Sequence, residues 1–183
     1  MGNTFFSTQK KVGILGGGQL GKMLVQSAAT LDIYTKVLDP DVEAPARWLC
    51  SEFQQGNLQD FDTVYNFGKD CAVLTIEIEH VNVDALKRLQ EEGVVVHPDP
   101  ASLEIIKDKG LQKIFFRSND LPSSDFHFYG SKKEVLSALA NGSIHLPFVQ
   151  KSRTDGYDGR GVLIVSQESD IQQLMDVPCI VED

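Results

Sequence analysis

Short hydrophobic runs alternate with amphipathic stretches over the first hundred residues of the chain. Four runs have the length and composition of strands, and the third is long enough to be buried on both faces: Val12–Leu15, Thr35–Leu38, Ala72–Ile78 and Val94–Val96. Strands that alternate with helices are typical of a parallel sheet covered by helices. The pattern therefore predicts an α/β fold with a Rossmann-like order of elements.

Three helices are expected between these strands. The second covers Asp60–Phe67, and the third begins after the cap residue Asn82 and ends at Gly93. The first follows the turn Gly16–Gly18, and helical spacing predicts that it buries a stripe of six residues: Leu20, Met23, Leu24, Ser27, Ala28 and Leu31. In the third, the expected inward side chains are Val83, Leu86 and Leu89.

The pattern changes after the turn-rich segment 97–100. A helical stretch runs from Ser102 to Asn119, and its expected buried side chains are Leu103, Ile106, Leu111, Ile114 and Phe115. Two further helices are expected: one begins at the capping-box pair Ser131 and Glu134, and the last covers Ser169–Met175. They lie among four more predicted strands: Phe126–Tyr129, Phe148–Lys151, Val162–Val165 and Cys179–Glu182. We therefore expect a second, α+β unit here.

Composition excludes some classes of function. The formal net charge of -9 argues against a nucleic-acid partner, because neutralising phosphates requires an excess of Lys and Arg. No apolar run is long enough to span a membrane. Three widely spaced cysteines, Cys50, Cys71 and Cys179, show no metal or redox spacing and fit a reducing, cytoplasmic location.

Gly16, Gly18 and Gly21 form a G-x-G-x-x-G motif between a strand and a helix. Such a motif lets backbone N–H groups approach a phosphate, and Asp39 lies at the end of the next strand, where a dinucleotide-binding fold has its ribose-binding acid. A dinucleotide site, another phosphate site and a purely structural turn all remain open on this motif alone.

A second glycine motif lies between two predicted strands, over Asp155–Gly161. Its three glycines and Arg160 suit a loop that closes over a polyphosphate, and Lys151 at the end of the preceding strand is placed to reach a phosphate. The alternative is an ordinary glycine-rich hairpin loop with exposed charges.

The run Lys151–Gly161, which contains the second motif, resembles the nucleotide loop of the 5-(carboxyamino)imidazole ribonucleotide synthases, ATP-grasp ligases of purine biosynthesis. Three further stretches agree with that family in order and spacing: Gly16–Leu24, Glu77–Val81 and Gln112–Lys113. The resemblance covers nearly the whole chain after an N-terminal extension, residues 1–10. It implies a Rossmann-like pre-ATP-grasp domain at 11–101, then linker helices and the truncated start of an ATP-grasp domain at 102–183.

The resemblance also implies an activity. Bicarbonate attacks the γ-phosphate of ATP, and the resulting carboxyphosphate carboxylates the amine of 5-aminoimidazole ribonucleotide during de novo purine biosynthesis. The family's Mg²⁺ ligands lie in a C-terminal half beyond residue 183, so no metal ligand is expected in this chain. The 183-residue chain is therefore expected to be an incomplete, inactive fragment. A homodimer is usual in the family.

Site residues follow from the same resemblance. Lys151 and Arg160 would offset the charge that develops in catalysis. The ATP contacts would be Lys109, Lys151, Gly156, Tyr157, Asp158, Gly159, Arg160, Gly161, Val162, Glu182 and Asp183. The ribonucleotide contacts would be Gly18, Gln19, Leu20, Glu77, Tyr157, Asp158 and Arg160.

Two positions depart from the family pattern. Lys109 stands where arginine is frequent, and Asp155 stands where glycine is common and would bring a carboxylate beside the polyphosphate. Two alternatives also stay open. One is another ATP-grasp carboxylase or ligase, and the other is a non-catalytic Rossmann module that binds a dinucleotide such as NAD. A metal site at Glu77, Glu79 and His80 is a less favoured interpretation than a strand-end loop near the ribonucleotide.

Overall fold

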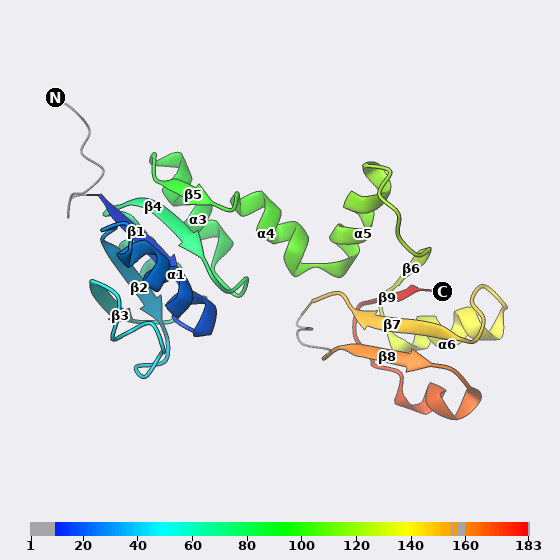
Figure 1. Ribbon diagram of the computed structural model, residues 1–183. Helices are drawn as coiled ribbons and strands as arrows, with labels where there is room; N and C mark the ends of the chain where they lie inside the picture. The colour runs from blue at the N-terminus through cyan, green and yellow to red at the C-terminus, as the bar shows by residue number, and fades with distance from the viewer. Residues whose placement is uncertain (1–9, 155, 157–159, 183) are drawn as a thin grey trace. The chain divides into compact units, whose positions relative to one another are not determined.

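The computed structural model describes residues 10–154, 156 and 160–182 of the chain. The chain divides into two compact units, Met1–Leu103 and Glu104–Asp183, and each has its own sheet (Figure 1). No helix in the described part is long and apolar enough to cross a bilayer.

The first unit is built on a five-stranded parallel sheet. Its order is β3-β2-β1-β4-β5, with the strands β1 Lys11–Leu15, β2 Thr35–Asp39, β3 Glu52–Gln55, β4 Cys71–Ile76 and β5 Val95–His97. Neighbouring strands are parallel throughout. The predicted α/β fold is confirmed for this unit. Strand β3 was not predicted, because an edge strand with a single hydrophobic residue, Phe53, carries no periodic signal.

Helices cover both faces of this sheet. α2 (Phe61–Gly68) and α3 (Val83–Glu91) bury Phe67, Leu86 and Leu89 against one face, together with Leu15 and Leu74. α1 (Gln19–Ala29) packs its Val25 against Ile14 and Val37 of the other face. The caps are local: the Asp60 side chain accepts a hydrogen bond from Thr63 N, and that of Asn82 accepts one from Ala85 N, as predicted for Asn82. Strand β4 is less enclosed than predicted, since only Cys71 and Leu74 are buried.

Of the six side chains predicted for the buried stripe of α1, only Ala28 is buried. The helix buries Gly21, Val25 and Ala28, whereas Leu20 and Leu31 are 64% and 61% exposed, and Met23, Leu24 and Ser27 also face outward. A Cβ on Gly21 would lie 2.5 Å from the carbonyl oxygen of Gly16. The helix approaches the strand backbone through its smallest residue, so its narrow small-residue face is buried and its larger side chains point away.

The helical stretch expected at 102–119 is two helices, α4 (Pro100–Lys107) and α5 (Lys109–Ser118), separated by Asp108. Of the five side chains predicted to be buried, only Leu103 is; Ile106, Leu111, Ile114 and Phe115 are exposed. The buried residues of α5 are instead Gly110 and Lys113. This helix turns its polar face inward because Lys113 meets a carboxylate of the second sheet.

The second unit contains a four-stranded antiparallel sheet of order β6-β9-β7-β8. Its strands are β6 Phe126–Tyr129, β7 Phe148–Ser152, β8 Val162–Val165 and β9 Cys179–Glu182. α6 (Lys132–Ala140) packs Val135 and Ala138 on one face, and a 3-10 helix, η1, covers Glu168–Gln173. The capping box is not formed as predicted: Ser131 makes no side-chain cap, and Glu134 accepts from Gly130 N.

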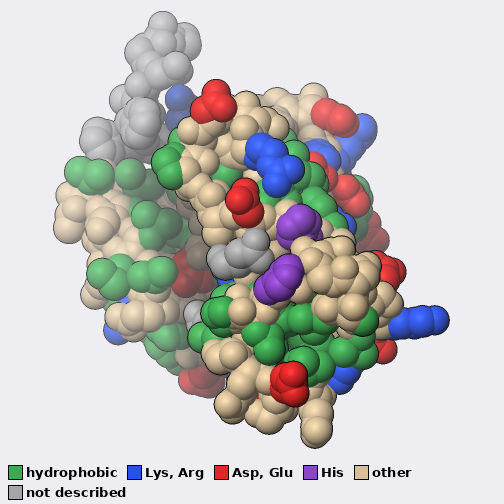
Figure 2. All heavy atoms as spheres, turned by 90° about the vertical axis from the view of Figure 1, so that its right-hand side faces the viewer, with side chains coloured by type: hydrophobic (Ala, Val, Ile, Leu, Met, Phe, Trp, Pro, Cys, Tyr) green, Lys and Arg blue, Asp and Glu red, His purple; other side chains and the backbone are tan. Residues whose placement is uncertain are grey.

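The face of this sheet that α6 leaves uncovered is partly open. Side chains alternate between the two faces along β8. Val165 points into the core under α6, so Val162 and Ile164 lie on the open face, where Ile164 is 66% exposed. Lys151 lies on the same face, because it neighbours Val162 across the β7–β8 hairpin. On the side of the molecule drawn in Figure 2, hydrophobic side chains reach the surface beside acidic, basic and histidine side chains. The open face thus combines apolar side chains with a lysine.

Candidate functional sites

Two loops of the first unit meet at the carboxyl ends of β1 and β4. The order of strands in the sheet reverses between β1 and β4, and ligands of open α/β sheets bind at such a switch point. Glu77 N donates to Leu15 O at 2.8 Å. Gly16 has φ +102°, and a Cβ on it would overlap the Glu77 carboxylate. Four predicted ribonucleotide contacts, Gly18, Gln19, Leu20 and Glu77, therefore lie close together at this edge of the sheet.

The Glu77 carboxylate lies at the N-terminus of α1. Burial raises its pKa above the ordinary value, as does the charge of Asp39, while hydrogen bonds from the backbone N–H groups of Gly21 and Leu20 oppose this rise. A dinucleotide-binding fold uses these helix N–H groups for the pyrophosphate. Here a carboxylate of the protein already occupies them, which argues against the dinucleotide interpretation.

Both carboxylate oxygens of Asp39 also accept hydrogen bonds from the protein backbone. Its Oδ2 accepts from Gly17 N at 2.6 Å, its Oδ1 accepts from Asp41 N at 2.8 Å, and the residue is buried. A ribose-binding acid needs an oxygen free for the sugar hydroxyl. Asp39 instead fixes the glycine turn on the end of β2, so it is a structural strand-end acid.

In the second unit, two predicted ATP contacts form an ion pair. The Lys151 ammonium of β7 lies 2.6 Å from Oε2 of Glu182 on β9, and Lys113 of α5 lies 3.1 Å from Oε1. Burial alone would raise the pKa of Glu182, but the hydrogen bonds from Lys151 and Lys113 hold it below its ordinary value. This part of the sheet face therefore has two cations around one carboxylate.

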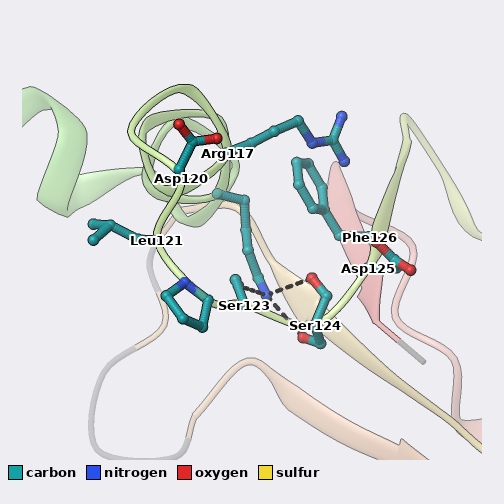
Figure 3. Close-up of a pocket in the computed structure, with 9 residues that line it drawn as sticks. Arg117, Asp120, Leu121, Ser123, Ser124, Asp125 and Phe126 are labelled. Carbon is teal, nitrogen blue, oxygen red and sulfur yellow. Dashed lines mark hydrogen bonds between the residues drawn. The ribbon is translucent and has the colours of Figure 1, made fainter.

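Lys113 belongs to a wider polar network. Its ammonium donates to Ser123 Oγ at 2.6 Å and to Ser124 Oγ at 2.8 Å, while Ser124 Oγ donates to Glu182 Oε2 at 3.1 Å. Figure 3 shows both serine side chains on the loop beside a pocket of about 360 Å³, where Arg117 lies over the ring of Phe126. The residues that line it are Lys113, Arg117, Asp120, Leu121, Pro122, Ser123, Ser124, Asp125 and Phe126.

Lys109 ties the start of α5 to the second glycine motif. Its Nζ donates to Gly156 O at 3.0 Å, and its backbone N donates to Arg153 O at 2.9 Å. Asp108 caps α5 through Gly110 N and also accepts from the Arg153 guanidinium at 2.6 and 3.1 Å. The helix start and the loop are thus held together by main-chain and side-chain bonds.

The base of the glycine loop is closed. Ser152 N donates to Gly161 O at 2.8 Å, and Gly161 has φ +71°, a conformation that favours glycine. Val162 pairs with Lys151, and Arg160 is exposed at the end of the loop. Five residues of the sequence argument, Asp155, Tyr157, Asp158, Gly159 and Asp183, lie outside the described residues. A clamp between Arg160 and Lys151 therefore stays a prediction.

Two protein-family models match the chain, and each covers most of one of the two units. The model of the ribonucleotide synthetase preATP-grasp domain matches residues 9–107, and that of the ATP-grasp domain matches residues 114–183. The chain belongs to the ribonucleotide synthetase preATP-grasp family. The match covers more than half of the chain, and the ATP-grasp match covers most of the rest.

Two curated relatives of this preATP-grasp chain show the likeness. The chloroplastic phosphoribosylaminoimidazole carboxylase of Vigna aconitifolia is 38% identical over 90% of the chain and 29% of that enzyme. The N5-carboxyaminoimidazole ribonucleotide synthase of Staphylococcus aureus is 32% identical over 88% of the chain and 42% of that enzyme. The chain thus spans less than half the length of these curated relatives.

A solved structure extends the likeness. The N5-carboxyaminoimidazole synthase of Aspergillus clavatus, in complex with ADP and 5-aminoimidazole ribonucleotide, has a TM-score of 0.84 and 32% identity over 98% of this chain and 47% of that one. The α/β sheet followed by a small antiparallel sheet is therefore the expected preATP-grasp and ATP-grasp architecture.

Sequence reasoning gave Lys113 no role in the site of this preATP-grasp chain, although Gln112–Lys113 is one of the stretches that resemble the family. The signal was present: Lys109, Lys113 and Arg117 follow one another at intervals of four and so share one face of α5. Neighbouring hydrophobic residues suggested that the opposite face was inward. The described residues contain no group of three His, Cys, Asp or Glu side chains placed to hold a metal ion.

Proposed function

We propose that this chain is the N-terminal part of a 5-(carboxyamino)imidazole ribonucleotide synthase. The whole protein would use ATP and bicarbonate to carboxylate 5-aminoimidazole ribonucleotide through carboxyphosphate, in de novo purine biosynthesis. The family membership and the activities of the relatives support this proposal. Among ATP-grasp enzymes, these relatives favour this ligase over another carboxylase.

The observation that carries the proposal is the position of Lys151. Its ammonium lies on the open sheet face next to Glu182, at the base of a glycine loop whose Gly156 is held by Lys109. Ammonium groups and backbone N–H groups of a glycine loop are the donors that a polyphosphate requires. Lys151 and Arg160 would offset the charge that develops on the transferred phosphoryl group.

The other contacts are proposed by the same argument. Lys109, Gly156, Gly161, Val162 and Glu182 would line the ATP site, together with Tyr157, Asp158, Gly159 and Asp183. Gly18, Gln19, Leu20 and Glu77 would hold the ribonucleotide at the switch point of the first sheet. Mg²⁺ would neutralise the phosphates when bound. The described residues contain no group of three His, Cys, Asp or Glu side chains placed to hold a metal ion, and we assign no Mg²⁺ ligand among them.

A homodimer in the cytoplasm completes the proposal. All three cysteines, Cys50, Cys71 and Cys179, are free thiols. Free thiols are typical of a reducing compartment, which supports this location.

Titration of the purified chain with ATP tests the proposal. We expect binding that weakens at least about tenfold in Lys151→Met, because the variant loses a charged donor to phosphate. Lys133→Met is the matched control: Lys133 is an exposed lysine of α6, on the helix that covers the other face of the sheet, and its loss should leave binding unchanged.

Titrations with NADH and with 5-aminoimidazole ribonucleotide separate the alternatives. We expect the ribonucleotide to bind and NADH not to bind, since Glu77 and Asp39 already use the N–H groups around the first glycine motif. Binding of NADH, with no response to ATP or the ribonucleotide, would establish the dinucleotide-binding module instead.

A further inference from the structure

Two lysines share Glu182, and they are held very differently. The Lys113 side chain is 10% exposed, and its ammonium contacts Glu182 Oε1, Ser123 Oγ, Ser124 Oγ and Ser124 O. Three ammonium hydrogens serve these four acceptors, so Lys113 has no donor left for a ligand. The Lys151 side chain is 29% exposed, and among the described residues its ammonium bonds to Glu182. Lys113 is held by all of these contacts, whereas Lys151 can exchange its hydrogen bond to Glu182 for a bond to a ligand.

The charges of this network do not cancel. Two ammonium groups face one carboxylate, and the Glu182 side chain is only 10% exposed. A buried carboxylate that loses its partner is strongly destabilising. If Lys151 were the sole counterion, then moving it to a phosphate would leave the Glu182 charge unpaired. Lys113 and Ser124 remain on Glu182 when Lys151 leaves, and this removes that cost.

We propose that Lys113 is a positioning residue that keeps Glu182 neutralised, so that Lys151 can leave Glu182 and bind a phosphate of the nucleotide. Lys113 itself does not touch the nucleotide. This inference rests on the proposed function, because it takes Lys151 to be a phosphate ligand. It assigns a role to a residue that sequence reasoning left without one.

A double-mutant cycle over Lys113 and Glu182 tests the inference. In the otherwise unchanged chain, Lys113→Met should weaken ATP binding about tenfold, because Lys151 becomes the sole counterion of Glu182. In the Glu182→Gln background, which has no carboxylate to neutralise, the same substitution should change ATP affinity less than about twofold. An equal loss in both backgrounds would mean that Lys113 contacts ATP or only supports the fold, and would overturn the inference.

A second measurement needs no nucleotide. Acetic anhydride labels free amines, and mass spectrometry of the peptides gives the rate for Lys151. We expect Lys113→Met to slow labelling of Lys151 by at least about threefold, because the remaining ion pair tightens. Glu182→Gln should accelerate it, and Lys113→Arg, which retains the charge, should leave it near that of the parent chain. An unchanged rate in Lys113→Met would overturn the inference.

The labelling also separates the inference from the proposed function. If the chain does not bind ATP but Lys151 labelling changes as expected, the proposed function fails while the charge exchange on Glu182 stands. If Lys113→Met does not fold, the double variant with Glu182→Gln removes a cation and an anion together, and circular dichroism checks its fold. Comparison with Glu182→Gln alone then decides: less than about twofold difference in ATP affinity and labelling supports the inference, and about tenfold overturns it.

Discussion

The sequence named single residues of the candidate ATP site, but it did not name their pairing. Lys151 and Glu182 were each found from the resemblance, and the structure joins them as an ion pair between neighbouring strands. Lys113 was given no role in the site, because its importance comes from a carboxylate on a distant strand. A buried charge has meaning only with its partner, and no local pattern names that partner.

The ion pairs of Glu182 predict a pH-dependent stability. Because the pKa of Glu182 in the folded chain lies below the ordinary value of 4.5, its stabilising effect is present above that pH and is lost as the pH falls through the folded value. Glu182→Gln should lower the free energy of unfolding by about 3 kcal/mol at pH 7. The difference from the parent chain should shrink as the pH falls from the ordinary value of 4.5 through the lower folded value.

Urea unfolding at several pH values measures this difference. Glu168→Gln is the control, an exposed acid of η1 whose loss should cost less than about 0.5 kcal/mol at any pH. A loss in Glu182→Gln that stays constant down to pH 3 would contradict the assigned role of its ionised form.

Elements were predicted best where local chemistry defines their ends. Strands β6, β8 and β9 have the predicted bounds, and Asn82 caps α3 as expected. The inward faces of α1 and α5 were predicted wrongly. Each helix has hydrophobic side chains on more than one side, so periodicity alone does not select the buried side. A close backbone approach selects it for α1, and an ion pair selects it for α5.

Two aspartate caps provide a matched test at this scale. Asp60 caps α2 through Thr63, while Asp108 caps α5 and also binds the Arg153 guanidinium in a fork. Asp60→Ala should cost about 1 kcal/mol of unfolding free energy, as ordinary caps do. Asp108→Ala should cost about 2–3 kcal/mol, because it loses a charge-assisted pair as well.

Urea unfolding of both variants and of Arg153→Met checks this difference. Arg153→Met removes the fork and leaves the cap, so it should account for the excess loss in Asp108→Ala. Equal losses for the two aspartate variants would mean that the fork adds nothing to the stability of the loop.

At the scale of the whole molecule, each unit contributes a different part of the proposed function. The first unit has the loops at Gly16–Gly18 and Glu77, and the second has Lys151, Lys109 and the glycine loop. The two family matches, 9–107 and 114–183, follow the same division. The two ligands should therefore leave separate signatures.

Hydrogen exchange with mass spectrometry can detect these signatures. ATP should slow exchange over 109–113 and 151–162, and 5-aminoimidazole ribonucleotide should slow it over 16–21 and 77–81, because bound ligands protect the backbone that they order. The chain without ligand is the reference. Protection of 16–21 by ATP, with none over 151–162, would place the nucleotide in the wrong unit and contradict the proposal.

The sequence by itself determined the class of fold, most strands and the second glycine loop. These depend on hydrophobic period, caps and turn residues, which are local properties of the chain. It also determined the family, through motifs whose residues lie next to one another.

Only the tertiary structure decided which residues meet. The edge strand β3, the inward faces of α1 and α5, the bond of Asp39 to the glycine turn and the three-residue network around Glu182 all depend on contacts between distant segments. Local propensity carries no information about such contacts, because they form only when helices pack and strands pair. The chemistry of the candidate site therefore lies in pairings that no single stretch of sequence encodes.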